Sequence, residues 1–232
     1  MIVIENKELE KAVLAGVSCI AVPLEVFVPT SGEAVITTYS FCKDIAKKWE
    51  ARYFEDILCE EALGWVEEEL KTVAENIGYE RFFSENESML EYVMEPGMQM
   101  PNFESCVKVH TISSNVVLSA LCENSGYDIE IADDGEDLIF AVVENGCILA
   151  YAGMNDVLYD DGSVEISVET APDERRKGYG AACVAALVNH LLNKGIAVRY
   201  KCAEENTPSS CLAEKLGFAL EGKRKSFVFE KI

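Results

Sequence analysis

The sequence predicts an α/β (α+β) fold, in which a mixed central sheet with flanking helices is preceded by a smaller α+β domain. Asn145-Gly146 lies between the apolar runs 138–143 and 147–154, and this dipeptide is a strong signal for a hairpin. Residues 163–170 alternate with a period of two, as expected for a strand, and run into a glycine-rich turn. A helical stripe with spacings of three and four follows the turn, formed by Val184, Leu187, Val188 and Leu191.

The remaining elements of the second part follow from apolar runs and turn residues. Residues 106–112 suit a strand and 114–124 a helix, and 196–202 suit another strand. Thr207-Pro208 is typical of a helix start, and Gly217 of a helix end. Two short strands, at 218–222 and 226–230, are expected to finish the chain.

The first part combines strands and helices without an evident catalytic grouping. Residues 22–28 and 33–39 are rich in Val, Ile and Thr and predict two strands around a turn. Residues 41–77 show a helical pattern. Two prolines and one glycine in 95–102, EPGMQMPN, disfavour a regular element. We therefore expect an accessory α+β domain over residues 1–100 and a second domain over residues 105–232.

The composition excludes several classes of function. The formal net charge is −21, from 41 acidic and 20 basic residues, which argues against binding to nucleic acid. The nine cysteines are scattered without a CxxC pair, and the two histidines are His110 and His190, so no metal site is expected. The N-terminus lacks the basic region of a signal peptide, and 13–28 is too broken to span a bilayer, so we expect a cytoplasmic protein without membrane association.

The segment 173–180, DERRKGYG, joins the alternating strand to the helix. Backbone N–H groups at a helix start have no partner inside the helix and carry the positive end of its dipole. Gly178 and Gly180 remove side chains that would keep a phosphate away, while Arg175, Arg176 and Lys177 add positive charge. The segment therefore predicts a site for a pyrophosphate.

Other nucleotide sites fit the sequence less well. A dinucleotide fingerprint beginning at Gly178 would have Cys183 at its third glycine, and hairpins precede the loop where parallel strands are needed. Residues 217–224 have the GxxxxGK spacing of a nucleoside triphosphate loop, but Arg224 stands where Ser or Thr must hold magnesium. Coenzyme A is the third candidate source of the pyrophosphate, and a resemblance to a known family supports it.

Two segments resemble the GNAT superfamily of N-acetyltransferases. Arg175, Gly178 and Gly180 meet its R/Q-x-x-G-x-G/A pattern, and 206–218, NTPSSCLAEKLGF, is similar to its N-x-x-S/A-x-x-L-Y-E-K-L-G-F segment. The resemblance covers about residues 105–232. Within the superfamily, EISVET and SSCLAEKLGF are similar to the branch that includes the zwittermicin A resistance acetyltransferase.

The resemblance implies a GNAT-type sheet and transfer of an acetyl group from acetyl-CoA to a primary amine of a small molecule. Since the chain is acidic, we expect a neutral or cationic acceptor. Backbone N–H groups would hold the pyrophosphate, the end of the preceding strand would pair with the pantetheine arm, and two further residues would contact the distal part of the cofactor. The residues implied for binding are Val168, Glu169, Thr170, Arg175, Arg176, Lys177, Gly178, Tyr179, Gly180, Ala181, Asn206 and Ser209.

The catalytic groups are less defined. Glu165 and Glu169 project from one face of the strand, and either is a candidate general base. Ala213 replaces the tyrosine that the family uses as proton donor, and Ser209 is a candidate substitute. The missing tyrosine also leaves open a non-catalytic acyl-CoA-binding sensor or interaction module. The amphipathic helices of the first part are expected to shape the acceptor site or a homodimer interface.

Overall fold

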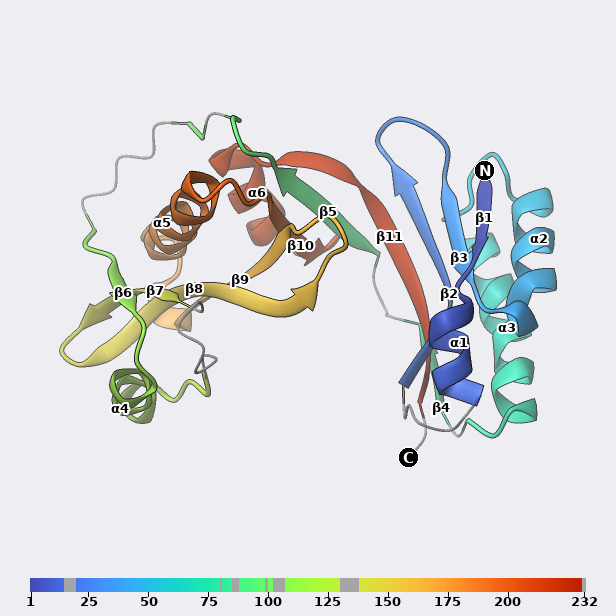
Figure 1. The fold of residues 1–232 in the computed structure, drawn as a ribbon, viewed down its shortest axis with the longest axis horizontal. Helices are drawn as coiled ribbons and strands as arrows, with labels where there is room; N and C mark the ends of the chain where they lie inside the picture. Colours follow the sequence, from blue (N-terminus) through green and yellow to red (C-terminus); the bar gives the residue numbers. More distant parts are fainter. Residues whose placement is uncertain are drawn as a thin grey trace. The chain divides into compact units, whose positions relative to one another are not determined.

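A computed structural model describes residues 1–14, 20–79, 81–84, 88–98, 100–101, 107–129 and 138–230 (Figure 1). The chain forms two compact units. Unit 1 comprises residues 1–91, 203–206 and 221–232, and unit 2 comprises residues 92–202 and 207–220. The chain therefore returns to unit 1 after completing unit 2.

Unit 1 contains a mixed sheet and three α-helices within the described residues (Figure 1). Its strands run in the order β1-β3-β2-β11, with β4 also paired to β11. β1 is parallel to β3, whereas β2 is antiparallel to β3 and β11 is antiparallel to both β2 and β4. The elements are β1 (Ile2–Glu5), α1 (Lys7–Leu14), β2 (Ile20–Pro29), β3 (Val35–Thr38), the 3₁₀ turn η1 (Ser40–Cys42), α2 (Lys43–Arg52), α3 (Glu60–Asn76), β4 (Arg81–Ser84), the first part of β5 (Met89–Met94) and most of β11 (Ala219–Glu230).

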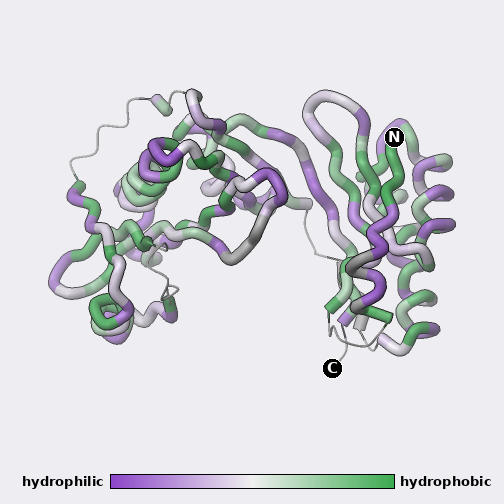
Figure 2. The backbone as a smooth tube through the Cα atoms, in the orientation of Figure 1, coloured by the Kyte–Doolittle hydropathy of each residue, from purple (hydrophilic) through white to green (hydrophobic). Residues whose placement is uncertain are grey.

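The core of unit 1 lies between its sheet and the helices α2 and α3. Helix α3 buries a stripe at a spacing of four residues, formed by Ala62, Val66, Leu70 and Ala74. The alternation of hydrophobic and hydrophilic residues along both helices is visible in Figure 2. Trp49 of α2 is fully buried, packs edge-on against Phe227 of β11, and donates a hydrogen bond to the carbonyl of Ile57. The C-terminal strand is thus part of the core of unit 1.

Unit 2 is built on a mixed sheet with the strand order β10-β9-β8-β7-β6. β9 and β10 are parallel, and the other pairs are antiparallel. This arrangement confirms the predicted mixed central sheet with flanking helices. The elements are β6 (His110–Ile112), α4 (Asn115–Ser125), β7 (Ile139–Glu144), β8 (Cys147–Leu158), β9 (Val164–Thr170), the 3₁₀ turn η2 (Pro172–Glu174), α5 (Tyr179–Asn193), β10 (Val198–Ala203) and α6 (Thr207–Leu216).

The hairpin predicted at Asn145-Gly146 is confirmed. Both residues have positive φ, 53° and 78°, and β7 pairs with β8 around them. Helix α5 buries the predicted stripe, since Val184, Leu187 and Val188 are inaccessible to solvent. The hairpin thus belongs to the sheet that precedes the glycine-rich turn, and α5 is the helix that follows the turn.

Three expectations about the elements need correction. The end of the chain is one strand, β11, instead of two short strands, because Gly222 lies inside the strand where a neighbour leaves no space for a side chain. The helical segment 41–77 is divided into α2 and α3. The sequence reasoning did not predict β1, α1, β4 or β5. Residues 102–106, which include the start of the expected strand 106–112, lie outside the described residues.

Candidate functional site

The glycine-rich turn has the backbone conformation that its sequence requires. β9 ends at Thr170, and α5 begins at Tyr179. Between them Arg176 has φ 66° and Gly178 has φ 86°, both in the left-handed region. In the described part of the chain, the N–H groups of residues 176–181 have no backbone acceptor. The turn therefore presents a row of unpaired donors at a helix start, which suits an anion.

The two glycines of the turn serve different purposes. A Cβ on Gly180 would lie 2.8 Å from Thr170 Oγ1 and 3.4 Å from Val168 Cγ2, so this glycine lets the start of α5 approach β9 closely. A Cβ on Gly178 would meet no heavy atom within 4 Å. The space in front of Gly178 is therefore open, and its residue type is explained by the positive φ and by access for a ligand.

Cations border this open side. The side chains of Arg175, Arg176 and Lys177 are exposed. Lys177 forms an ion pair of 2.7 Å with Glu174, and Arg175 Nε donates a long hydrogen bond of 3.4 Å to the Thr170 carbonyl. The three cations match the charge of a pyrophosphate at this turn. An acyl-CoA pyrophosphate therefore fits the residues that are present.

β9 and β10 pair only over their first residues. The two strands pair over Val164–Ile166 and Val198–Tyr200, whereas β9 continues to Thr170 and β10 to Ala203. The N–H of Val164 donates to the Ala197 carbonyl, and that of Ala171 to the Leu149 carbonyl of the strand on the other side. Because these directions alternate along a strand, the N–H groups of Val168 and Thr170 face the side on which β10 no longer pairs. An extended ligand can hydrogen-bond there as an added strand.

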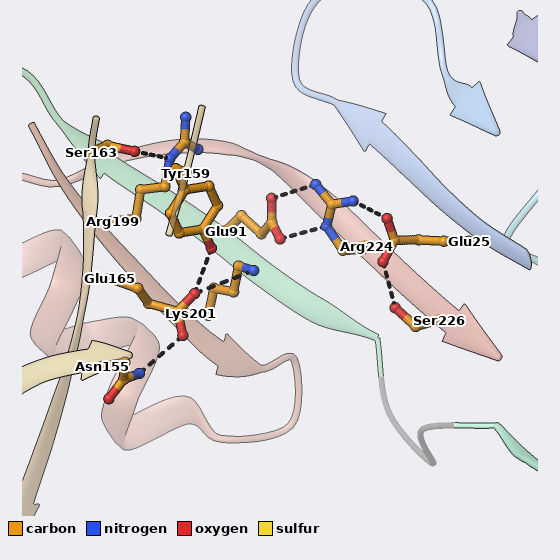
Figure 3. Close-up of polar contacts among 10 residues, drawn as sticks. All are labelled: Glu25, Glu91, Asn155, Tyr159, Ser163, Glu165, Arg199, Lys201, Arg224 and Ser226. Carbon is orange, nitrogen blue, oxygen red and sulfur yellow. Dashed lines mark hydrogen bonds and ion pairs between the residues drawn. The ribbon is translucent and has the colours of Figure 1, made fainter. Parts of the chain in front are cut away.

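Glu165 lies in a polar cluster on the other face of β9. Since Val168 and Thr170 point toward α5, the odd-numbered side chains of β9 point away from it. The Glu165 carboxylate accepts hydrogen bonds from Asn155 Nδ2 at 3.0 Å and from the Tyr159 hydroxyl at 2.6 Å (Figure 3). Lys201 Nζ forms an ion pair with it at 3.3 Å (Figure 3).

These contacts determine the charge of Glu165. Its side chain is only 12% exposed, and burial by itself raises the pKa of a carboxyl group. The Tyr159 hydrogen bond, the Lys201 charge and the Asn155 hydrogen bond outweigh burial, so the pKa of Glu165 lies below its ordinary value. Glu165 is therefore a carboxylate at neutral pH, as a general base must be.

Glu169 has a more open setting than Glu165. Its side chain is exposed and accepts a hydrogen bond of 3.2 Å from the Tyr151 hydroxyl. Burial and the Glu169 charge raise the pKa of Tyr151 to about 12. Tyr127 packs edge-on against Tyr151, with ring centres 5.2 Å apart, and its buried hydroxyl has no hydrogen-bond partner among the described residues. Glu169 is thus the less constrained of the two candidate bases.

The start of α6 holds Ser209 in a hydrogen bond. Ser209 Oγ lies 2.6 Å from the hydroxyl of Tyr200, which is 2% exposed, and either group can donate. Asn206 is exposed and directly precedes the helix. Ala213 is fully buried, so its methyl group packs in the core of unit 2 and cannot serve as a proton donor. The Tyr92 hydroxyl donates a long hydrogen bond of 3.5 Å to the neighbouring Glu214.

The GxxxxGK spacing at 217–224 does not form a phosphate loop. Gly222, Lys223 and Arg224 belong to strand β11. Arg224 donates to both carboxylate oxygens of Glu91, at 2.6 and 3.1 Å, and also pairs with Glu25 in unit 1 (Figure 3). The rejection of this motif as a phosphate loop is therefore confirmed.

Residues 138–227 match the model of the GNAT acetyltransferase family. The matched region leaves out the N-terminal part of the chain. It contains the turn, both diverging strands and α6. The family transfers acetyl groups from acetyl-CoA, so the match indicates an acyltransferase with acetyl-CoA as its donor. No curated protein sequence matches the chain.

Solved structures of GNAT proteins resemble the fold. A GCN5-related N-acetyltransferase-like protein from Streptococcus suis is 19% identical, with a TM-score of 0.50 over 91% of this chain and 88% of that one, and this likeness shows the fold. A GNAT-family protein from Novosphingobium aromaticivorans is 16% identical, with a TM-score of 0.49 over 65% and 68% of the chains. A GCN5-related N-acetyltransferase from Kribbella flavida is 17% identical, with a TM-score of 0.46 over 69% and 63%.

The sequence did not predict which residues contact the candidate bases Glu165 and Glu169. Asn155, Tyr159 and Lys201 surround Glu165, while Tyr151 and Tyr127 lie near Glu169. The alternation of β10 places Lys201 on one face, but only the register with β9 brings that face to Glu165. No metal-ligand cluster of His, Cys, Asp or Glu occurs among the described residues, and no described helix is long and apolar enough to cross a membrane.

Proposed function

We propose that the protein acetylates a primary amine of a small molecule, and that this acceptor is neutral or cationic. The observation that carries the proposal is the row of free N–H groups at 176–181, together with the parting of β9 and β10 beside it. This combination supports an acyl donor held along the strand edge. The carboxylates on the face away from α5, in a chain of net charge −21, favour an ammonium over an acidic acceptor.

Each donor-binding residue has a proposed task. The backbone of residues 176–181 would hold the pyrophosphate, and the exposed cations Arg175, Arg176 and Lys177 would neutralise it. The backbone at Val168–Thr170 would pair with the pantetheine arm, with an N–H there polarising the acyl carbonyl. Asn206 and Ser209 would contact the distal part of the donor.

Transfer to an amine requires removal of a proton from the ammonium group. Glu165 is our first candidate for this task because it is ionised and directly precedes Ile166, the last residue of β9 that pairs with β10 before the two strands part. Glu169 is the second, since its exposed carboxylate has one tyrosine donor. The departing thiolate needs little help from an acid, because thiols ionise at about pH 8–9. Transfer is therefore proposed to proceed without a tyrosine in place of Ala213.

Four broader expectations belong to the same proposal. The chain acts in the cytoplasm, and it falls in the branch that resembles the zwittermicin A resistance acetyltransferase. The expected bounds are residues 1–100 for an accessory domain and residues 105–232 for the domain that binds acetyl-CoA, whereas the compact unit that contains residues 1–91 also includes 203–206 and 221–232. The accessory domain shapes the acceptor site or a homodimer interface, because its helices are amphipathic without a nucleophile–base grouping.

Calorimetry of a paired set of variants tests the donor site. Gly178→Asp places a carboxylate in the open space before the N–H row, so acetyl-CoA binding should fall below detection. Gly195→Asp is the matched control, because Gly195 also has positive φ, 75°, and nothing within 4 Å of an added Cβ. It should bear the same backbone strain and keep its affinity. Unchanged affinity of folded Gly178→Asp would remove the proposed donor site.

A further inference from the structure

Lys201 brings a primary amine of the chain itself to the candidate base. Its Nζ lies 3.3 Å from Glu165 Oε2 and 5.3 Å from the centre of the Tyr159 ring. Its side chain is 24% exposed, so the amine is partly shielded while remaining open to a ligand. The protein thus holds an ammonium, a carboxylate and an aromatic face together, which is the set of groups that an acceptor site for an amine needs.

The position of Lys201 along β10 places it at the start of the strand gap. The last pair of residues between the two strands is Tyr200 and Ile166, so Lys201 is level with Ser167. Val168 follows, and its N–H faces the side on which β10 has parted. Lys201 is therefore the first residue of β10 beyond the paired region, next to the strand edge assigned to the acyl donor.

We propose that Lys201 is a site of self-acetylation, in which the Lys201 amine of a chain takes the acetyl group from acetyl-CoA bound to the same chain. This inference rests on the proposed donor site. Glu165 takes a proton from the Lys201 ammonium, and the freed nitrogen forms an amide bond to the acetyl carbon. The carbon–sulfur bond breaks and its electron pair leaves as coenzyme A thiolate. The nitrogen loses its second proton as the amide forms, and the thiolate takes up that proton directly or through solvent.

The modification changes the electrostatics of the cluster. An acetylated lysine carries no charge, so Glu165 loses its cationic partner while the Tyr159 and Asn155 hydrogen bonds remain. Loss of the Lys201 charge raises the pKa of Glu165 toward its ordinary range. A carboxylate with a higher pKa is a stronger base, so the first turnover would prepare the site for external amines.

The test uses the full chain, acetyl-CoA with a deuterated acetyl group, and no added amine. Peptide mapping by mass spectrometry follows the label on each lysine over time. Lys223 is the internal control, because it also lies on a strand and pairs with a carboxylate, that of Glu204. We expect Lys201 to be labelled at least about tenfold faster than Lys223, since only Lys201 gains from proximity. The rate should not depend on protein concentration.

Three variants separate the steps. Lys201→Arg keeps the charge and should abolish the label at this position, while Lys223→Arg should leave labelling of Lys201 unchanged. Glu165→Gln should slow labelling of Lys201 by about tenfold or more, because it removes the base. Gly178→Asp should reduce labelling to the background rate, because it removes donor binding.

Calorimetry on the unlabelled chain distinguishes failure of this inference from failure of the proposed function. If acetyl-CoA binds but Lys201 is labelled no faster than Lys223, self-acetylation is overturned and the donor site stands. A labelling rate that grows with protein concentration also overturns it, because the acetyl group then passes between chains. If acetyl-CoA does not bind, the proposed donor site fails and this inference fails with it.

Discussion

Lys201 is one of the groups that lower the pKa of Glu165, and its Nζ lies 3.3 Å from the carboxylate. Replacing Lys201 with Met removes this charge, so the pKa of Glu165 should be higher than in Lys201→Arg, which keeps a cation that the proposed self-acetylation cannot remove. If Glu165 is the base, the acidic limb of the kcat/KM profile should then move to higher pH, because a larger fraction of Glu165 is protonated at a given pH. A pH–rate series on the variant measures the shift. Lys223→Met is the control, and an equal shift in both variants would contradict the assignment.

Replacement of the two glutamates identifies the base. Glu165→Gln should lower kcat by about 10²- to 10⁴-fold and remove the acidic limb, whereas Glu169→Gln should keep that limb. The reverse result would transfer the role to Glu169. The depressed pKa also stabilises the fold: the contribution of Glu165 is present at neutral pH and is lost as the pH falls through its folded-state pKa.

Ser209 provides a test of whether transfer needs a general acid, since Ala213 stands where the family has a proton-donating tyrosine. Since the coenzyme A thiolate is a good leaving group, Ser209→Ala should lower kcat by no more than about tenfold. Tyr200→Phe removes the hydroxyl 2.6 Å from Ser209 Oγ and keeps the buried ring. It should have an effect no larger than that of Ser209→Ala. A loss of about 10²-fold or more in Tyr200→Phe would instead make Tyr200 part of the proton path.

At the scale of the element, β11 is one continuous strand because Gly222 has no side chain and so lets Phe27 and Val28 of β2 approach closely. A Cβ on Gly222 would lie 2.4 Å from the Val28 carbonyl oxygen and 2.7 Å from the Phe27 ring. Gly222→Ala should therefore destabilise the protein by about 1–3 kcal/mol. Gly64→Ala is the matched control, because Gly64 lies in helix α3 with nothing within 4 Å of an added Cβ. It should stabilise by about 0.5–1 kcal/mol. Urea denaturation compares both variants.

The same strand shows why sequence reasoning succeeded in some elements and failed in others. The Asn145-Gly146 hairpin and the turn before α5 depend on local backbone preferences, which a sequence displays directly. Gly222 depends on a neighbour almost two hundred positions away in the chain, so it was taken for the end of a strand. The cluster around Glu165 was missed for the same reason, because residues of β8, β9 and β10 meet there only through the sheet register.

At the scale of the whole molecule, the net charge of −21 predicts how the rate responds to salt. An acidic protein attracts a cationic acceptor over a distance that added salt shortens. For a cationic amine, kcat/KM should fall as ionic strength rises, while kcat stays nearly constant. A neutral amine of similar size is the control and should show little change. A preference for acidic acceptors in a panel of amines would contradict the proposed substrate class.

The path of the chain through its two units has a consequence for biosynthesis. Unit 2 is complete at Leu220, whereas unit 1 still lacks most of β11 at that point. Phe227 and Phe229 of β11 are fully buried in the core of unit 1, and the strand pairs with β2. Most of unit 1 is therefore synthesised before unit 2, but unit 1 can complete its sheet and core only after β11 has been synthesised. Until then, the apolar residues of 1–91 that pack against β11 in the folded protein stay exposed. We expect chaperones to bind this exposed surface during translation.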